Sequence, residues 1–193
     1  MKKVYVVYHS GFGHTTRQAQ AIQQGAAAVD GIESVLLHTE EATERLDELD
    51  GADAIVFGCP TYMGSMSAEM KKFLEVAAAK WAVQAWKDKV AGGFTNSGSL
   101  SGDKLSTLNG LFLFAMQQSM VWVGLGMLPS SNDREAVKTI QGPGPDAHNR
   151  SGSFVGPMAS SFEVGPDEAP SKGDLETAEL YGRRVGETVL RLR

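Results

Sequence analysis

The sequence predicts an α/β fold, namely a doubly wound, five-stranded parallel sheet of order 2-1-3-4-5 with helices on both faces. Short β-rich runs alternate with longer runs of helical periodicity along most of the chain. The first β-rich run, VYVVY (4–8), is continuously apolar, as expected of a strand that is covered on both faces. A length of 193 residues suits a single domain over 1–193.

The expected elements follow one another as such a sheet requires. The first helix is expected from Thr16 to Val29, because apolar residues recur there at helical spacing and Gly31 can end it. The further expected strands are SVLLH (34–38), AIVFG (54–58), VAGGF (90–94) and VWVGLG (121–126). The further expected helices are a short one at about 43–49, one that begins near Ser67, and two at about 103–119 and 173–192. The helix near Ser67 has a predicted apolar face of Met66, Met70, Phe73, Leu74, Ala77 and Trp81. The segment 126–172 is predicted to be a long loop.

Composition and charge exclude several classes of function. The net charge of −5, without a lysine-rich stretch, argues against nucleic acid as a partner. No apolar run approaches the length that a membrane span needs. The single cysteine, Cys59, cannot form an internal disulfide, so we expect a cytoplasmic protein. The four histidines lack the spacing of metal ligands, and no metal site is expected.

Three polar, glycine-containing segments follow the first, third and fourth expected strands. They are SGFGHTT (10–16), PTYMGS (60–65) and TNSGS (95–99). In the predicted sheet the carboxyl ends of these strands are neighbours, and ligands bind beyond such ends. We therefore expect the three segments to share one crevice.

The first segment has the composition of a phosphate site at a helix N-terminus. It offers the hydroxyls of Ser10, Thr15 and Thr16, together with main-chain N–H groups. A nucleotide-hydrolase loop would need a lysine that is absent here, and a dinucleotide fingerprint would need a third glycine where Thr16 stands. Hydroxyls and amides without a cation suit a terminal phosphate monoester.

The second and third segments contain no set of acid, base and nucleophile at catalytic spacing. They supply an aromatic side chain, Tyr62, and small residues such as Gly64 and Gly98 that allow the main chain to approach a ring. Amide and hydroxyl groups complete them. This composition favours a planar heteroaromatic ring held along its edge.

These motifs resemble a known family. Ser10-Gly-Phe-Gly-His-Thr15 is similar to the FMN-phosphate loop of flavodoxin-like proteins, in the form found in NAD(P)H:quinone oxidoreductases of the tryptophan-repressor-binding-protein type. FGCPTYMGSMSAEMKKFLE (57–75) resembles that family's F-G-x-P-T-x-x-G-x-M-x-x-x-M-K-x-F-L. The chain is thus identified as a member of the flavodoxin-like NAD(P)H:quinone oxidoreductases and NADPH-dependent FMN reductases.

The resemblance implies FMN as the cofactor and NAD(P)H as the co-substrate. The residues that it assigns to FMN are Ser10, Phe12, Gly13, His14, Thr15, Pro60, Thr61, Tyr62, Met63, Gly64, Thr95, Asn96, Ser97, Gly98 and Ser99. It places Trp81 beside the flavin, and we expect Trp81 and Gln118 to shape the substrate slot, together with HNRSGSFVG (148–156). No protein side chain is assigned a catalytic role, because the flavin carries the chemistry.

Two departures from the family pattern affect these expectations. Gln117-Gln118-Ser119-Met120 stands where the family has His-His-Gly-Met, so the detailed route of quinone reduction is open. The segment after the second strand is shorter than in those reductases, so a homodimer and a homotetramer are both possible. Apolar residues at Phe112, Phe114, Met116 and Trp86 fit either such association or burial within one chain.

Two functions follow from the resemblance. The first is an oxidoreductase that transfers hydride from NAD(P)H through FMN to a quinone, a flavin or a similar small acceptor. The alternative is a flavodoxin-type electron carrier that binds FMN without NAD(P)H turnover. A receiver domain or a hydrolase is disfavoured, because Cys59-Pro60 replaces the receiver's aspartate and no GxSxG elbow is present. The sequence leaves NADH versus NADPH and the acceptor's identity open.

Overall fold

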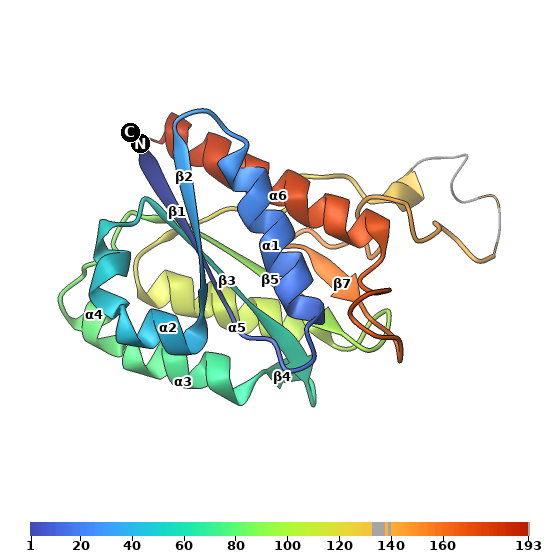
Figure 1. Cartoon of the computed structure of the whole chain (residues 1–193), viewed down its shortest axis with the longest axis horizontal. Coiled ribbons are helices and arrows are strands. Elements are labelled where there is room, and N and C mark those ends of the chain that lie inside the picture. The colour runs from blue at the N-terminus through green and yellow to red at the C-terminus, as the bar shows by residue number, and fades with distance from the viewer. Residues whose placement is uncertain (133–137, 139, 193) are drawn as a thin grey trace.

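The computed structural model describes residues 1–132, 138 and 140–192, and its centre is a twisted parallel sheet (Figure 1). The strand order of the main sheet is β2-β1-β3-β5-β6. If these five strands are numbered in chain order, leaving out β4 and β7, the order is 2-1-3-4-5. The predicted topology is therefore confirmed. Two short strands add to it, because β4 pairs antiparallel with β3 and β7 pairs parallel with β5.

The elements have the following bounds. The strands are β1 (Lys2–Tyr8), β2 (Ile32–His38), β3 (Ala54–Tyr62), β4 (Ser65–Met66), β5 (Val90–Ser97), β6 (Val121–Trp122) and β7 (Met158–Ser160). The α-helices are α1 (His14–Ala27), α2 (Thr39–Glu44), α3 (Ala68–Val76), α4 (Ala78–Ala82), α5 (Lys104–Gln117) and α6 (Lys172–Arg191). Two 3-10 helices cover Leu46–Gly51 and Ser130–Asn132.

The register of the central strands sets the position of the three polar segments. Tyr8 at the end of β1 pairs with Gly58 of β3, and Pro60 near the end of β3 pairs with Asn96 of β5. The segments that follow β1, β3 and β5 therefore leave the same edge of the sheet side by side. The strands themselves are buried, because helices cover both of their faces.

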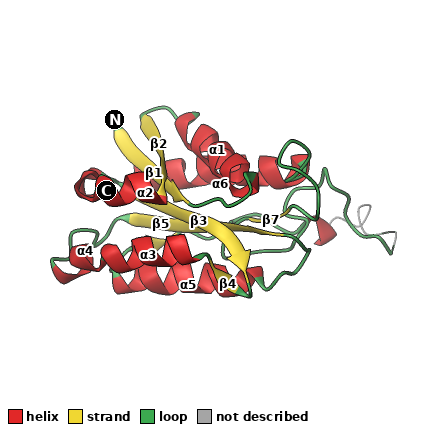
Figure 2. Ribbon diagram, turned by 60° about the horizontal axis from the view of Figure 1, so that its bottom comes forward, coloured by secondary structure: helices red, strands yellow, loops and turns green. Residues whose placement is uncertain are grey.

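Helices α1 and α6 cover one face of the sheet (Figure 2). They approach closely because glycines stand where they meet. A side chain at Gly25 would lie 1.8 Å from the carbonyl oxygen of Glu179, and one at Gly182 would lie 2.0 Å from that of Ile22. Tyr181 of α6 is completely buried against the sheet, and its hydroxyl donates to the carbonyl of Val123 at 2.7 Å.

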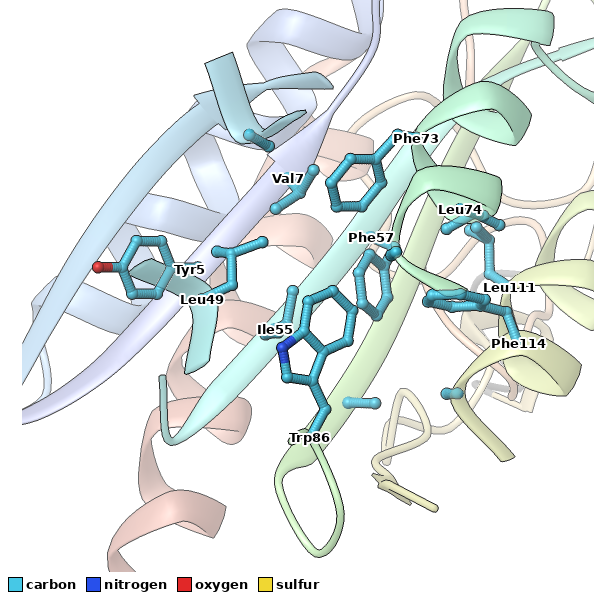
Figure 3. Close-up of a cluster of buried hydrophobic side chains, with 14 of the residues drawn as sticks. Tyr5, Val7, Leu49, Ile55, Phe57, Phe73, Leu74, Trp86, Leu111 and Phe114 are labelled. Atoms are coloured by element: carbon cyan, nitrogen blue, oxygen red, sulfur yellow. The ribbon is translucent and has the colours of Figure 1, made fainter. Parts of the chain in front are cut away.

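The opposite face carries an aromatic core beneath α3 and α5 (Figure 3). The rings of Phe57 and Phe114 meet edge to face with centroids 5.4 Å apart. Trp86 is completely buried, and its indole N–H donates to Asp50 at 2.9 Å. Phe112 packs edge to face on Trp122. Burial within one chain thus accounts for Trp86 and Phe114, whereas Met116 remains partly exposed.

The last strand position of the sheet is filled by two separate pieces. The predicted strand 121–126 was too long, because only Val121 and Trp122 pair with β5. Further along β5, the partner is β7, which lies inside the predicted loop 126–172. Within that loop, residues 133–137 and 139 lie outside the described residues. The edge of the sheet nearest the third polar segment is therefore built by a part of the chain that the periodicity did not predict.

Two helix predictions also need correction. The short helix expected at about 43–49 begins earlier, at Thr39, and a 3-10 helix replaces its second half. The helix near Ser67 begins as predicted, with the Ser67 hydroxyl accepting from the N–H of Met70, but it ends at Val76. The shorter helix α4 begins two residues later, at Ala78 (Figure 1). Trp81 therefore leaves the predicted apolar face and is 54% exposed.

Candidate functional site

A cavity of about 500 Å³ opens at the carboxyl edge of the sheet, where the three polar segments meet. Most of the predicted residues line it, namely Ser10, Phe12, His14, Thr15, Pro60, Thr61, Tyr62, Asn96, Ser97 and Gly98. A fourth segment, 161–166, completes the wall. The volume falls within the range of small-molecule and cofactor sites, which is roughly 300–1,000 Å³.

The first wall of the cavity is the N-terminus of α1. Gly13 precedes the helix with a φ of 90°, a backbone conformation that glycine adopts without steric cost, and no side chain caps the helix. The N–H of Gly13 donates to the hydroxyl of Ser10 at 3.1 Å. The next three N–H groups, those of His14, Thr15 and Thr16, have no partner within the helix. This end of α1 therefore presents donors and the positive end of a helix dipole to the cavity.

The second wall is the hairpin between β3 and β4. Tyr62 reaches across to the first segment, where a side chain on Gly11 would lie 2.5 Å from its hydroxyl. Its ring also meets that of Phe12 edge to face, with centroids 6.3 Å apart. Met63 and Gly64 form the turn of the hairpin with φ of 47° and 74°. Neither lines the cavity, and Met63 is fully exposed, so we place these two predicted residues at its rim.

Buried threonines join the second and third segments. The hydroxyl of Thr61 lies 2.8 Å from that of Thr95 and 2.8 Å from that of Thr107 on α5. Thr95 also donates to the carbonyl of Cys59 at 2.7 Å and is completely buried. The hydroxyl of Thr95 is therefore used within the protein, and the predicted contact of Thr95 with a ligand stays a prediction. Its position fixes the two neighbouring segments relative to each other.

The third wall begins at Asn96, whose side chain is almost completely buried. Its amide nitrogen donates to the hydroxyl of Ser161 at 3.1 Å, whereas its amide oxygen has no hydrogen-bond partner among the residues that the structure describes. A buried acceptor without a donor is costly, and a ligand in the cavity can supply the donor. Ser99, also predicted to line the site, instead turns its carbonyl to the side chain of Lys104 at 2.6 Å.

Lys104 is a residue of this region that sequence reasoning missed. It is the first residue of α5, and only 1% of its surface is exposed. Its ammonium donates to the hydroxyls of Ser97 and Ser160 at 3.0 and 2.9 Å, besides the carbonyl of Ser99. Burial lowers the pKa of Lys104 to about 8. A lysine at a helix N-terminus opposes the helix dipole, and that conflict was a signal available in the sequence.

The segment 161–166 was also missed, and it covers the first wall. The Nε2 atom of His14 lies 2.8 Å from the carbonyl oxygen of Val164. The guanidinium of Arg17 donates to the carbonyls of Pro166 and Ala169 at 2.5 and 3.4 Å. Phe162 borders the cavity and is 47% exposed, and its backbone has a φ of 50°. A bulky residue in that conformation is an outlier that the surrounding contacts must maintain.

Within a single chain, the segment 148–156 does not reach the slot that it was expected to help shape. Asn149 of this segment binds back to the carbonyls of Met127 and Ser153, at 3.1 and 3.0 Å, and Ser153 donates to Gly156. None of its residues lines the cavity. The segment instead fastens the long loop to β6, since the indole N–H of Trp122 donates to the carbonyl of Val155.

Trp81 and Gln118 also lie away from the cavity within one chain. Trp81 is on α4, which follows the C-terminal end of α3, whereas the hairpin of β3 and β4 precedes the N-terminal end of α3. Gln118 follows the last turn of α5. Gln118 is buried, and its side-chain amide donates to the carbonyl of Ala77 at 3.0 Å. Within a single chain neither residue lines the cavity, and their role in shaping the substrate slot stays a prediction.

The described residues, 1–132, 138 and 140–192, offer little support for metal or thiol chemistry. They contain no group of three or more metal-ligating side chains. No helix in this part of the chain is long and apolar enough to cross a membrane. Cys59 is completely buried, and burial raises the pKa of its thiol to about 12, so it is not poised as a nucleophile.

Comparison with known proteins places this arrangement in a family. The model of the family described as NADPH-dependent FMN reductase matches residues 30–133. Flavodoxin FldP of Pseudomonas aeruginosa is 42% identical over 186 residues, which cover 96% of this chain and 95% of that protein. An NAD(P)H dehydrogenase (quinone) of Syntrophobacter fumaroxidans is 33% identical, with 98% of both chains covered.

Solved structures agree with these matches. The crystal structure of the flavodoxin, WrbA-like protein from Agrobacterium tumefaciens is similar with a TM-score of 0.74 and 38% identity, and the whole of both chains is covered. A flavodoxin from the domain Archaea shares the fold with a TM-score of 0.67 at 20% identity, over 97% of this chain and 99% of that one. The chain belongs to the NADPH-dependent FMN reductase family of flavodoxin-like proteins.

Proposed function

We propose that this protein is an FMN-dependent oxidoreductase that takes reducing equivalents from NAD(P)H and passes them to a quinone, a flavin or a similar small acceptor. The observation that carries this proposal is the cavity at the carboxyl edge of the sheet, where a helix N-terminus, an aromatic hairpin and an amide-bearing loop converge. Family membership supports the same chemistry, because the matched family is described by NADPH-dependent FMN reduction and a 33% identical relative is named NAD(P)H dehydrogenase (quinone).

The phosphate of FMN fits the first wall. The unpartnered N–H groups of residues 14–16 and the hydroxyls of Ser10 and Thr15 can together surround a doubly negative monoester. The described residues that line the cavity include no lysine or arginine. Binding there would therefore depend on hydrogen bonds from the main chain and on the helix dipole.

The ring of FMN fits the space between the second and third walls. Tyr62 and Phe162 are both partly exposed at the cavity, so each offers an aromatic face to a planar ligand. Asn96 offers its unpartnered amide oxygen, and Gly98 leaves room for the main chain to approach a ring edge. Thr95, Met63, Gly64 and Ser99 would support these contacts from behind or from the rim.

The remaining task of the protein is to hold the reactants and to limit the access of water. When bound, FMN supplies the two-electron chemistry that connects NAD(P)H with the acceptor. Segment 161–166, tied to α1 by His14 and Arg17, would cover the phosphate end. The hairpin residues Tyr62 and Met63 border the open side, where a nicotinamide and an acceptor would enter in turn. Dependence on NAD(P)H leads us to place the reaction in the cytoplasm.

The direct test uses protein reconstituted with FMN under anaerobic conditions. Addition of NADPH or NADH is expected to bleach the flavin absorbance, and addition of a benzoquinone is expected to restore it with steady turnover. The comparison of the two nucleotides also identifies the preferred donor. Binding of FMN without any bleaching by either nucleotide would refute the enzyme and leave an FMN-binding protein.

The alternative function, an electron carrier, is favoured by one observation, the 42% identity to a relative named Flavodoxin FldP. A carrier would accept electrons from a separate reductase and would show no turnover with NAD(P)H and quinone alone. Adding a reductase of known activity therefore separates the two functions. Turnover that is independent of added reductase supports the enzyme.

We also propose that the protein self-associates through the outer face of α5. Leu105, Leu113 and Met116 are 50%, 61% and 38% exposed, and they lie on one side of this helix. Light scattering is expected to show a homodimer or a homotetramer, and Leu113→Glu is expected to reduce it to a smaller species. A wild-type monomer at all concentrations would refute this.

A further inference from the structure

Among the described residues two lysines, Lys80 and Lys104, are almost completely buried, and only Lys80 of these two is paired with carboxylates. Lys80 is 7% exposed and donates to Asp47 and Asp50, which raise its pKa. Lys104 is 1% exposed, yet its three hydrogen-bond acceptors are two hydroxyls and a carbonyl, all of them neutral. A buried charge without an opposite charge lowers the stability of the fold, so we look for a functional role for Lys104.

Two ionic groups, Asp174 and Arg150, act on the charge of Lys104 with opposite signs. Asp174 of α6 accepts two hydrogen bonds from Arg150, both at 3.1 Å, and the side chains of this pair are 4% and 11% exposed. The charge of Asp174 raises the pKa of Lys104 and the charge of Arg150 lowers it, and the ion pair of Asp174 and Arg150 has no net charge. Lys104 is also the first residue of α5, where the helix dipole opposes a cation. The region therefore holds one uncompensated positive charge.

This charge lies directly behind the wall of the cavity. Ser97 lines the cavity, and its hydroxyl accepts from the ammonium of Lys104 at 3.0 Å. The hydroxyl of Ser97 also donates to the carbonyl of Ser99 at 3.0 Å, and the hydroxyl of Ser160 donates to the same carbonyl at 3.1 Å. The loop can thus keep its hydrogen bonds when the lysine is replaced, because two donors to Ser99 remain.

We propose that Lys104 is a positioning residue whose ammonium, held behind Ser97, favours the reduced, negatively charged form of the bound ring through its charge. The inference rests on the proposed function. Hydride transfer breaks a C–H bond of NAD(P)H, which leaves as NAD(P)⁺, and brings one proton and two electrons to the flavin. The ring thereby gains one negative charge, and Lys104 keeps its proton throughout. The lysine compensates this charge only when the ring is reduced, so it stabilises the reduced form more than the oxidised form.

The test compares four FMN-loaded proteins: wild type, Lys104→Met, Lys104→Arg and the control Lys87→Met, which removes an exposed charge before β5 at the other end of the sheet. The affinity for oxidised FMN is measured by titration, and the midpoint potential is measured against a dye of known potential. Together they give the affinity for reduced FMN. Thermal unfolding of each apoprotein at neutral pH shows whether the fold is retained.

For Lys104→Met we expect the affinity for reduced FMN to fall about tenfold more than that for oxidised FMN, which lowers the two-electron midpoint potential by about 30 mV. Lys104→Arg is expected to restore most of the potential, and Lys87→Met to leave it unchanged. The Lys104→Met apoprotein is expected to be at least as stable as wild type, because it no longer buries a charge.

Two outcomes would overturn the proposal. If Lys104→Met weakens both redox forms equally, the lysine is a structural support of the loop and not a positioning residue for the reduced ring. If the potential of Lys104→Met equals that of wild type, the charge does not reach the ring. A wild-type protein that binds FMN but is not reduced by NAD(P)H would refute the proposed function instead, and the potentials would still decide the role of Lys104.

Discussion

Replacing Arg17 tests whether the segment 161–166 holds FMN in place. Arg17 lies in the first turn of α1, and its guanidinium donates to Pro166 at 2.5 Å and to Ala169 at 3.4 Å. Methionine at this position keeps an unbranched apolar side chain and removes both donors. The shorter bond is the one that matters, and a hydrogen bond from a charged donor contributes about 1.5–3 kcal/mol.

A loss of about 2 kcal/mol corresponds to a change of about 30-fold in the equilibrium between the tied and the released segment. If FMN leaves only when the segment is released, Arg17→Met is expected to speed FMN dissociation by up to that factor. The oxidised protein is diluted, and the appearance of free flavin fluorescence is followed with time.

The matched control is Arg183→Met, which removes an exposed guanidinium from α6. It is expected to release FMN at the wild-type rate. An unchanged rate for Arg17→Met, with the fold intact, would contradict the argument, because it would mean that FMN can leave while the segment remains tied or that the segment does not cover it.

Three further predictions concern the wall, the core and the buried lysine. Gly13→Ala is expected to lower the unfolding free energy by about 1–2 kcal/mol and to weaken FMN binding, because Gly13 has a φ of 90° and a new Cβ would lie 3.1 Å from Pro166. Denaturation measures the change in unfolding free energy, and titration with FMN measures the change in affinity. Phe57→Ala, in the completely buried aromatic core, is expected to lower the unfolding free energy by about 3–5 kcal/mol, and a loss under 1 kcal/mol would contradict its packing. Burial lowers the pKa of Lys104 from its ordinary 10.5 to about 8, so the unfolded chain binds this proton more tightly between these values. The unfolding free energy of the wild-type apoprotein, relative to Lys104→Met, is therefore expected to rise as pH increases through this window and to be flat below it.

The strand order and most of the cavity could be predicted because they depend on local signals. The continuous apolar run at 4–8 and the alternation of strands with helices determine a doubly wound sheet. In such a sheet the segments after β1, β3 and β5 must leave the same edge, so Ser10, Tyr62 and Asn96 come together although they are far apart in sequence.

The residues that were missed depend on partners distant in the chain. β7 is only three residues long and is a strand because β5 offers it an unpaired edge. Segment 161–166 has no periodicity, and only the carbonyl contacts to His14 and Arg17 bring it over the cavity. Trp81 was misplaced for the opposite reason, since the apolar period continues past Val76 although the helix does not. Local pattern decides the elements, and long-range hydrogen bonds decide which of them meet at the site.

The central claim is that main-chain amides at the N-terminus of α1 hold the phosphate of FMN without a cationic side chain. Titrating the apoprotein with FMN and with riboflavin, which lacks only the phosphate, tests it most directly. Hydrogen bonds to a charged group contribute about 1.5–3 kcal/mol each, so even two of them predict that FMN binds at least about a hundredfold more tightly. Equal affinities for the two flavins would contradict the account.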